Sequence, residues 1–258
     1  MNQVTSSDGT VIAYERSGEG APVILIGGAL SDRRAAAPLV AALSPHLGAV
    51  AYDRRGRGDS GDTQPYAVER EIDDLDALIG DLGGAVVVYG HSSGAAIALE
   101  AVARGLAISR VAVFEPPFRV EGSPRLPEGY LERLTALTSS GHGAEAVELF
   151  MREAVGLPAE AIARTRAAPE WSALEALAHT VRYDSLLMGE GTLPTDRLAR
   201  VTIPTLVLAS TGSPAWLQHA ADATAAGITG AQRSTLEGVF HSVPPDTLAP
   251  VLVSFLTT

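Results

Sequence analysis

The stretch AVVVYGHSSGAAIALEAVAR, residues 85–104, is the most informative part of this chain. The apolar run Ala85–Tyr89 has the length and composition of a strand buried on both faces of a sheet. The alanine-rich run Ala95–Arg104 has the composition of a helix, and Gly90–Gly94 joins the two. These five residues match G-x-S-x-G, in which a serine stands exposed on a strained strand-to-helix turn. The context predicts that Ser92 is a nucleophile, the alternative being a serine that only caps the helix.

Similar apolar runs recur along the chain. Two short β patterns flank a turn at Ser7-Asp8-Gly9, and further strand patterns follow at 23–26, 48–52, 85–89, 111–114, 205–209 and 233–236. Helical patterns lie between or after them, at 38–43, 68–82, 95–104 and 246–256. Because strands and helices alternate, the sequence predicts an α/β fold with a doubly wound, mostly parallel sheet of eight strands.

The strand pattern disappears between Pro116 and Asp196. Leucines at 131, 134 and 137 have helical spacing, and glycines and prolines divide the stretch into about four short helices. We therefore expect a core formed by residues 1–116 and 197–258, and a helical insert, residues 117–196, that covers the core as a cap. The alternative is that these helices are additional parts of the core.

Composition excludes several kinds of chemistry. The 258 residues are 46% hydrophobic and 19% charged, which allows a sizeable core. The chain contains neither cysteine nor lysine, so disulfides, thiolate nucleophiles, Schiff-base lysines and a P-loop lysine are all excluded. Serine, threonine, tyrosine, histidine and the carboxylates remain as reactive groups.

Charge and hydropathy also narrow the expected partners. A formal net charge of −11 opposes nucleic-acid binding. The first residues carry no signal-peptide pattern, and no apolar run reaches the roughly 18 residues of a membrane span. We expect a cytoplasmic protein that acts on a small molecule, without a nucleic-acid or membrane partner.

A nucleophilic serine requires a base, and His241 is the best candidate among six histidines. It follows the last predicted strand, in a loop at the carboxyl edge of the sheet, and it lies after Ser92 in the chain as a Ser–acid–His order requires. His91 lies inside the elbow, where the backbone directs it away from Ser92. His142 and His179 belong to the helical insert.

A second glycine motif invites a different interpretation. Residues 56–61 match the dinucleotide pattern G-x-G-x-x-G, but the third glycine leads into Asp62-Thr63-Gln64-Pro65 rather than a helix. A pyrophosphate would find no helix N-terminus there. No His, Asp or Glu spacing is typical of a catalytic metal site, so we expect neither cofactor nor metal.

Taken together, these segments resemble the α/β-hydrolase superfamily over essentially the whole chain. Residues 26–29 occupy the position of its His-Gly-x loop, and Tyr52–Ser60 resembles its D-x-R-G-x-G-x-S stretch. Gly90–Gly94 corresponds to its nucleophile elbow and His241 to its C-terminal histidine. The resemblance implies an oxyanion hole formed by the backbone N–H groups of Ala29 and Ser93.

The third member of the triad departs from the usual pattern. Most relatives place an Asp just after the strand that corresponds to 205–209, but here Ser210–Pro214 contains no carboxylate and Ser213 stands in its place. The other known location is the end of the preceding strand, where this chain has Glu115. Fungal zearalenone lactonases, which the chain resembles distantly, also carry a Glu there. The resemblance therefore implies Glu115 as the acid, with Asp184 and Asp222 as weaker alternatives.

These residues together predict a serine hydrolase that cleaves an ester or lactone through an acyl-enzyme. A serine in this slot opposes haloalkane dehalogenase and epoxide hydrolase chemistry, whose relatives use Asp. Thioesterase, C–C hydrolase, acyl-transfer and perhydrolase activities remain open, as does a receptor-like protein that only binds a small molecule. For a small, hydrophobic substrate the candidate binding residues are Gly28, Leu30, Phe118, Trp171, Tyr183 and Met188.

Overall fold

Eight strands form one sheet in the computed structural model, which describes residues 1–258, in the order β1-β2-β4-β3-β5-β6-β7-β8. β1 pairs antiparallel with β2 and β2 with β4, and all the remaining pairs are parallel. The predicted α/β class and its mostly parallel sheet are therefore confirmed. The strands are β1 (Asn2–Thr5), β2 (Val11–Ser17), β3 (Pro22–Ile26), β4 (Gly48–Tyr52), β5 (Val86–His91), β6 (Ile108–Phe114), β7 (Thr205–Ser210) and β8 (Gln232–Leu236).

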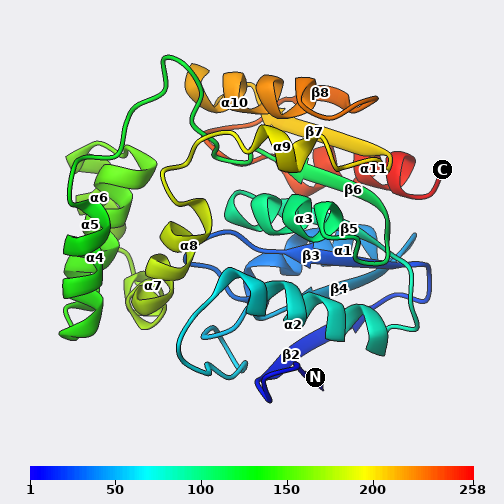
Figure 1. The fold of residues 1–258 in the computed structure, drawn as a ribbon, viewed down its shortest axis with the longest axis horizontal. Coiled ribbons are helices and arrows are strands. Elements are labelled where there is room, and N and C mark those ends of the chain that lie inside the picture. Colours follow the sequence, from blue (N-terminus) through cyan, green and yellow to red (C-terminus); the bar gives the residue numbers. More distant parts are fainter.

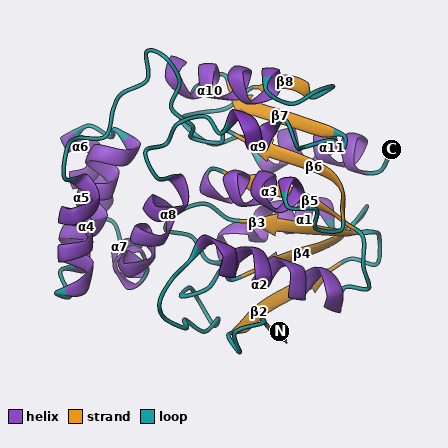
Figure 2. Ribbon diagram, in the orientation of Figure 1, coloured by secondary structure: helices purple, strands orange, loops and turns teal.

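Helices cover both faces of the sheet, as Figure 2 shows. In β3, Ile24 and Ile26 belong to one apolar core, and Val23 and Leu25 belong to the other. Successive side chains of a strand point to opposite faces, so an unbroken apolar run is what a doubly covered strand requires. The first core is closed by α2 (Val68–Asp81), α3 (Ser93–Ala103) and α10 (Ala215–Ala226), and the second by α1 (Ala37–Leu43) and α11 (Pro245–Leu256).

The helical insert lies between β6 and β7. Figure 1 shows α4–α7 beyond one end of the strands, with α8 between them and α3. Six α-helices are present where the sequence predicted about four. Two of them have only four and six residues, which is too short for a repeating helical pattern to be recognised in the sequence. They are α4 (Tyr130–Ser139), α5 (Gly143–Leu149), α6 (Ala159–Ala167), α7 (Trp171–Ala176), α8 (Val181–Met188) and α9 (Thr195–Leu198).

Three single-turn elements complete the fold: 3₁₀ turns at Arg33–Ala36 and Ala178–Thr180, and a π-helical segment at Phe150–Val155. None of the helices combines the length and the apolar composition needed to cross a bilayer. The parallel strands β3, β5 and β6 bring the segments that follow them to one edge of the sheet. Those segments carry the predicted oxyanion loop, the predicted nucleophile and Glu115.

Candidate active site

The nucleophile elbow is a tight turn between β5 and α3. Ser92 has φ 56° and ψ −122°, a conformation that costs an L-residue about 1–3 kcal/mol. A methyl group on Gly90 would lie 2.5 Å from the Gly94 carbonyl oxygen, and one on Gly94 would lie 2.2 Å from the Ile26 carbonyl oxygen. Only glycine fits at both positions, so the two glycines of the motif permit the turn that exposes Ser92.

Backbone strain in this protein is concentrated at the predicted site. Four non-glycine residues have positive φ: Leu30, Ser92, Glu115 and His241. Three of them are the predicted triad, and Leu30 directly follows the predicted oxyanion donor Ala29. Strained residues persist only where the surrounding structure holds them, and they cluster at functional sites.

His241 and Glu115 are in direct contact. His241 Nδ1 lies 2.6 Å from Glu115 Oε2, well within hydrogen-bond reach. The carboxylate is fully buried, and its other oxygen accepts a hydrogen bond of 2.7 Å from the Ser210 amide. The structure thus places a carboxylate on the predicted base from the end of β6.

The loop that follows β7 supports the histidine without supplying a carboxylate. Ser213 Oγ accepts a hydrogen bond of 2.9 Å from the His241 amide. Ser210 Oγ donates to the Val239 carbonyl, at 2.7 Å, in the loop that carries His241. Both serines therefore hold the backbone around His241.

Electrostatics favour an ionised Glu115. Burial alone would raise the pKa of its carboxyl, but hydrogen bonds from His241, the Ser210 amide and Ser213 together lower that pKa below its ordinary value. The neighbouring His91 differs, because burial and the proximity of His241 lower its pKa to about 4. His91 is therefore neutral near pH 7, and its Nε2 contacts the His241 carbonyl oxygen at 3.2 Å.

The predicted oxyanion loop approaches the nucleophile closely. A methyl group on Gly28 would lie 2.9 Å from Ser92 Cβ, so the backbone passes directly beside the serine. Ser31 Oγ and Arg57 Nη1 both donate to the Gly28 carbonyl, which fixes the peptide unit that carries the Ala29 N–H. Ser93 opens α3, where the first backbone N–H groups have no partner within the helix.

Ser92 and His241 line the same cavity, but the structure contains no hydrogen bond between their side chains. Such contacts are commonly long in free enzymes and tighten only when substrate binds. The roles of Ser92, His241, Glu115, Ala29 and Ser93 therefore stay predictions that the geometry makes specific.

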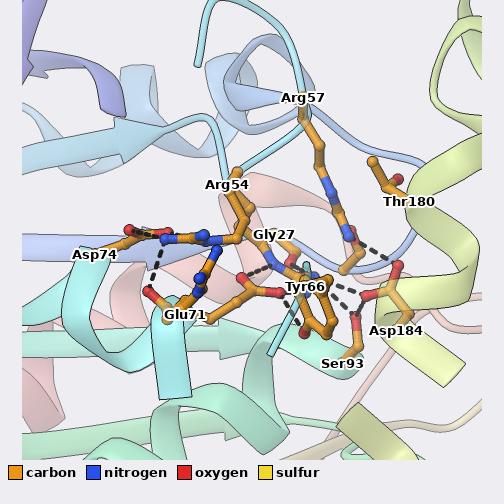
Figure 3. A network of polar contacts seen from close by, with 12 residues as sticks. Gly27, Arg54, Arg57, Tyr66, Glu71, Asp74, Ser93, Thr180 and Asp184 are labelled. Carbon is orange, nitrogen blue, oxygen red and sulfur yellow. Dashed lines mark hydrogen bonds and ion pairs between the residues drawn. The ribbon is translucent and has the colours of Figure 1, made fainter. Parts of the chain in front are cut away.

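A buried ionic network contacts Ser93 of the elbow (Figure 3). Asp184, from α8 of the insert, accepts hydrogen bonds from Arg54 Nη1 at 2.8 Å, Arg57 Nη2 at 2.7 Å and Ser93 Oγ at 2.6 Å. Arg54 forms a second, bidentate pair with Glu71 of α2. Sequence reasoning considered Asp184 only as an alternative acid and missed this network. The repeated arginines of the Tyr52–Ser60 stretch were the available signal.

A cavity of about 590 Å³ opens beside Ser92 and His241, a size typical of small-molecule sites. Among the predicted binding residues, Gly28 and Met188 lie on its wall. The other four do not: Leu30 and Trp171 pack within the insert clusters, Phe118 belongs to the sheet core, and Tyr183 stacks on Tyr66. Other apolar side chains line the cavity instead: Phe114, Leu126, Tyr130, Phe150, Val155, Trp216 and Phe240.

The G-x-G-x-x-G loop surrounds a buried carboxylate of its own chain. Asp53 is fully buried and accepts hydrogen bonds from the backbone amides of Arg33 and Asp59, at 2.7 and 2.9 Å. A methyl group on Gly58 would lie 2.2 Å from Asp53 Oδ2. Nowhere in the chain do three or more histidine or carboxylate side chains gather in a way that could hold a metal ion.

Comparison with known proteins places this site in context. A family model described as "Alpha/beta hydrolase family" matches residues 23–249. An alpha/beta hydrolase from Sphaerobacter thermophilus is 54% identical, with a TM-score of 0.95 over 98% of this chain and 99% of that one. An enol-lactonase from Burkholderia xenovorans is 25% identical, with a TM-score of 0.75 over 100% of both chains. An esterase from a Rhodococcus species, 20% identical, shares the fold with a TM-score of 0.71 over 98% of this chain and 95% of that one.

Proposed function

The chain belongs to the alpha/beta hydrolase family, and on that premise we propose that it is a serine hydrolase that cleaves a carboxylic ester or lactone through an acyl-enzyme. One observation carries the proposal. A buried carboxylate holds His241 at 2.6 Å, at the edge of the same cavity where the strained elbow exposes Ser92. This arrangement supplies a nucleophile, a base and an orienting anion.

In the proposed reaction, His241 accepts the Ser92 proton while Ser92 Oγ attacks the substrate carbonyl. The Ala29 and Ser93 amides stabilise the developing oxyanion, a contribution of about 3–4 kcal/mol per donor in related acyl chemistry. Glu115 orients the ring and stabilises the imidazolium, which then protonates the leaving alcohol. Water activated by His241 releases the acyl group.

The leaving group, the acceptor and turnover itself distinguish the proposal from its alternatives. The largely apolar wall of the cavity fits a small organic ester or lactone. A thioesterase or acyltransferase would form the same acyl-enzyme but differ in leaving group or acceptor. A receptor-like protein would bind its ligand without turnover.

The test is a panel of chromogenic acyl esters and lactones with wild type and Ser92→Ala, together with labelling by a fluorophosphonate probe. We expect the probe to label Ser92 of wild type, and Ser92→Ala to lose at least about 10⁴-fold in kcat. Ser254→Ala, at an exposed position on α11, is the matched control and should retain full activity.

Two results would contradict the proposal. A Ser92→Ala variant that keeps more than a few per cent of activity would exclude Ser92 as the nucleophile. A wild type that neither hydrolyses any ester or lactone nor reacts with the probe would favour the receptor-like alternative.

A further inference from the structure

Arg119 carries a charge that nothing in the cavity balances. It lies on the cavity wall, four residues after Glu115, where the chain enters the insert. The other arginine and carboxylate side chains on this wall each lie within 4.0 Å of an opposite charge: Asp32, Arg33, Arg54 and Asp184. Arg119 has no such partner, although it is about half-buried and burial lowers its pKa.

The structure holds the Arg119 guanidinium in place without neutralising it. The backbone N–H of Arg119 donates to the Gly191 carbonyl, and the side-chain stem packs so closely on Gly191 that a methyl group there would lie 3.0 Å from Arg119 Cδ. The guanidinium donates to two neutral carbonyls, Pro124 from Nη1 and Ala154 from Nη2. A guanidinium has five N–H donors, so three have no hydrogen-bond partner within the protein.

We propose that Arg119 forms an anion subsite, so that the substrate is an ester or lactone that carries a carboxylate remote from the scissile bond. The planar fork of a guanidinium matches a carboxylate and can bind it through two hydrogen bonds. The Arg119 guanidinium has one positive charge. A carboxylate, with one negative charge, neutralises it, whereas a phosphate dianion would leave one negative charge in excess. This proposal rests on the proposed hydrolysis and replaces the expectation of a wholly hydrophobic substrate with an amphipathic one.

The position of Arg119 also limits the length of the substrate. Four residues of extended chain span at most about 14 Å, which bounds the distance between the Arg119 and Glu115 Cα atoms, and Arg119 and Ser92 line the same cavity. Apolar side chains, such as Leu126, Phe150 and Met188, line the same cavity. A carbon chain crossing this wall would place its carboxylate at Arg119 and its ester carbonyl at Ser92.

The experiment compares two series of aryl esters of equal length. One series contains monoaryl esters of glutaric, adipic, pimelic and suberic acids, and the other contains aryl esters of the corresponding neutral alkanoic acids. For wild type we expect kcat/KM to favour the carboxylate ester by at least about tenfold at one chain length, and the preference to fall with added salt. Arg119→Gln should lose that preference, with a 10- to 100-fold fall for the carboxylate ester and less than about threefold for its neutral partner.

Arg119→Lys keeps the charge but loses the fork, so it should retain part of the preference. Arg164→Gln removes the same charge from an exposed position on α6, outside the cavity, and should behave as wild type. In parallel, calorimetry measures the binding of glutarate, adipate, pimelate and suberate to wild type and Arg119→Gln. We expect at least one dicarboxylate to bind wild type at least about tenfold more tightly.

The outcomes separate this proposal from the proposed function. If wild type hydrolyses neutral esters but shows no carboxylate preference at any length, the subsite is refuted and the hydrolase stands. If no ester is cleaved but a dicarboxylate binds through Arg119, the subsite stands and the hydrolase does not. If Arg119→Gln lowers kcat/KM equally for both ester series, the subsite is refuted and Arg119 only connects Pro124 and Ala154 structurally. If Arg119→Gln does not fold, the carboxylate preference of wild type, the salt dependence of that preference and the reduced preference expected of Arg119→Lys still test the subsite.

Discussion

Glu115 and Asp184 are two buried carboxylates near the predicted nucleophile, and they differ in the kind of partner that each contacts. Glu115 contacts the imidazole of His241, the predicted base, whose side chain is 20% exposed. Asp184 contacts Arg54 and Arg57, which stay charged and are almost fully buried. Both carboxyls have a lowered pKa, because hydrogen bonds and opposite charges outweigh the effect of burial.

The difference shows how the same functional group, a buried carboxylate, acquires different tasks. An anion beside a titratable ring at an open cavity can stabilise a charge that appears during a reaction. An anion between two permanent cations, in contact with Ser93 Oγ, has no such charge to respond to and instead fixes the geometry around it. We expect changes at Glu115 to affect turnover and changes at Asp184 to affect stability.

The largest effect should come from Glu115→Gln. Without its anion, the His241 imidazolium is less stable and its tautomer is less well defined, so we expect kcat to fall about 10²- to 10⁴-fold with little change in KM. The free energy of unfolding should change far less than kcat. Glu237→Gln, in the exposed part of the loop that carries His241, is the matched control and should be neutral. A Glu115→Gln variant with wild-type kcat would exclude the role of orienting acid.

A second change tests whether the position of the anion matters. Ser213 Oγ accepts a hydrogen bond from the His241 amide and contributes to the lowered pKa of the Glu115 carboxyl, so a carboxylate there would lie near the same ring. We expect Ser213→Asp, added to Glu115→Gln, to restore part of the lost kcat, whereas Ser213→Asn in the same background should restore none. Equal rates for the two double variants would show that the anion is not what Glu115 contributes.

Asp184→Asn should have the largest effect on stability. It leaves two buried guanidinium groups without one of their anions, and breaking such a pair from one side costs about 3–5 kcal/mol. Denaturant unfolding measures the loss. Asp222→Asn breaks the exposed pair with Arg233 and should cost less than about 1 kcal/mol. Similar losses for the two variants would contradict a structural role for the buried network.

The pH dependence of that loss has a definite sign. The pKa of Asp184 is lower in the folded protein than in the unfolded chain, so its contribution is complete above the unfolded value of about 4. It is lost as pH falls through the lowered folded value. The difference in unfolding free energy between wild type and Asp184→Asn should therefore be constant from about pH 5 to 8 and shrink below about pH 4. A difference that grows on acidification would refute this assignment.

The smallest effect concerns strain at the elbow itself. Ser92 has a positive φ, and glycine adopts such a conformation without a steric penalty. We expect Ser92→Gly to be more stable than Ser92→Ala by about 1 kcal/mol, the strain relieved minus the extra chain entropy of glycine. Thermal unfolding of the two inactive variants measures this difference in stability. Equal midpoints would show that the surroundings, and not the backbone of Ser92, bear the strain.

Local pattern was sufficient to predict the sheet and the elbow. Unbroken β-branched runs indicate strands covered on both faces, and Gly90 and Gly94 indicate a turn that no larger residue permits. Glu115 was implied by the resemblance to the α/β-hydrolase superfamily, which has a second known location for the acid at the end of the preceding strand, and the structure places Glu115 on His241. The short helices α7 and α9 were missed because four to six residues carry no detectable period.

What the sequence determined by itself was therefore local: the strands, the strained turn and the residue types that follow each strand. The tertiary structure alone decided which distant side chains meet, because such contacts leave no periodic signal. Arg54 and Asp184 lie 130 residues apart and pair at 2.8 Å. Tyr183, the neighbour of Asp184, stacks on Tyr66 and does not line the cavity, although the sequence suggested it as a substrate-binding residue. Arg119 has no acidic partner in the folded chain. This follows from where the carboxylates pack in the tertiary structure, and no motif around Arg119 indicates it.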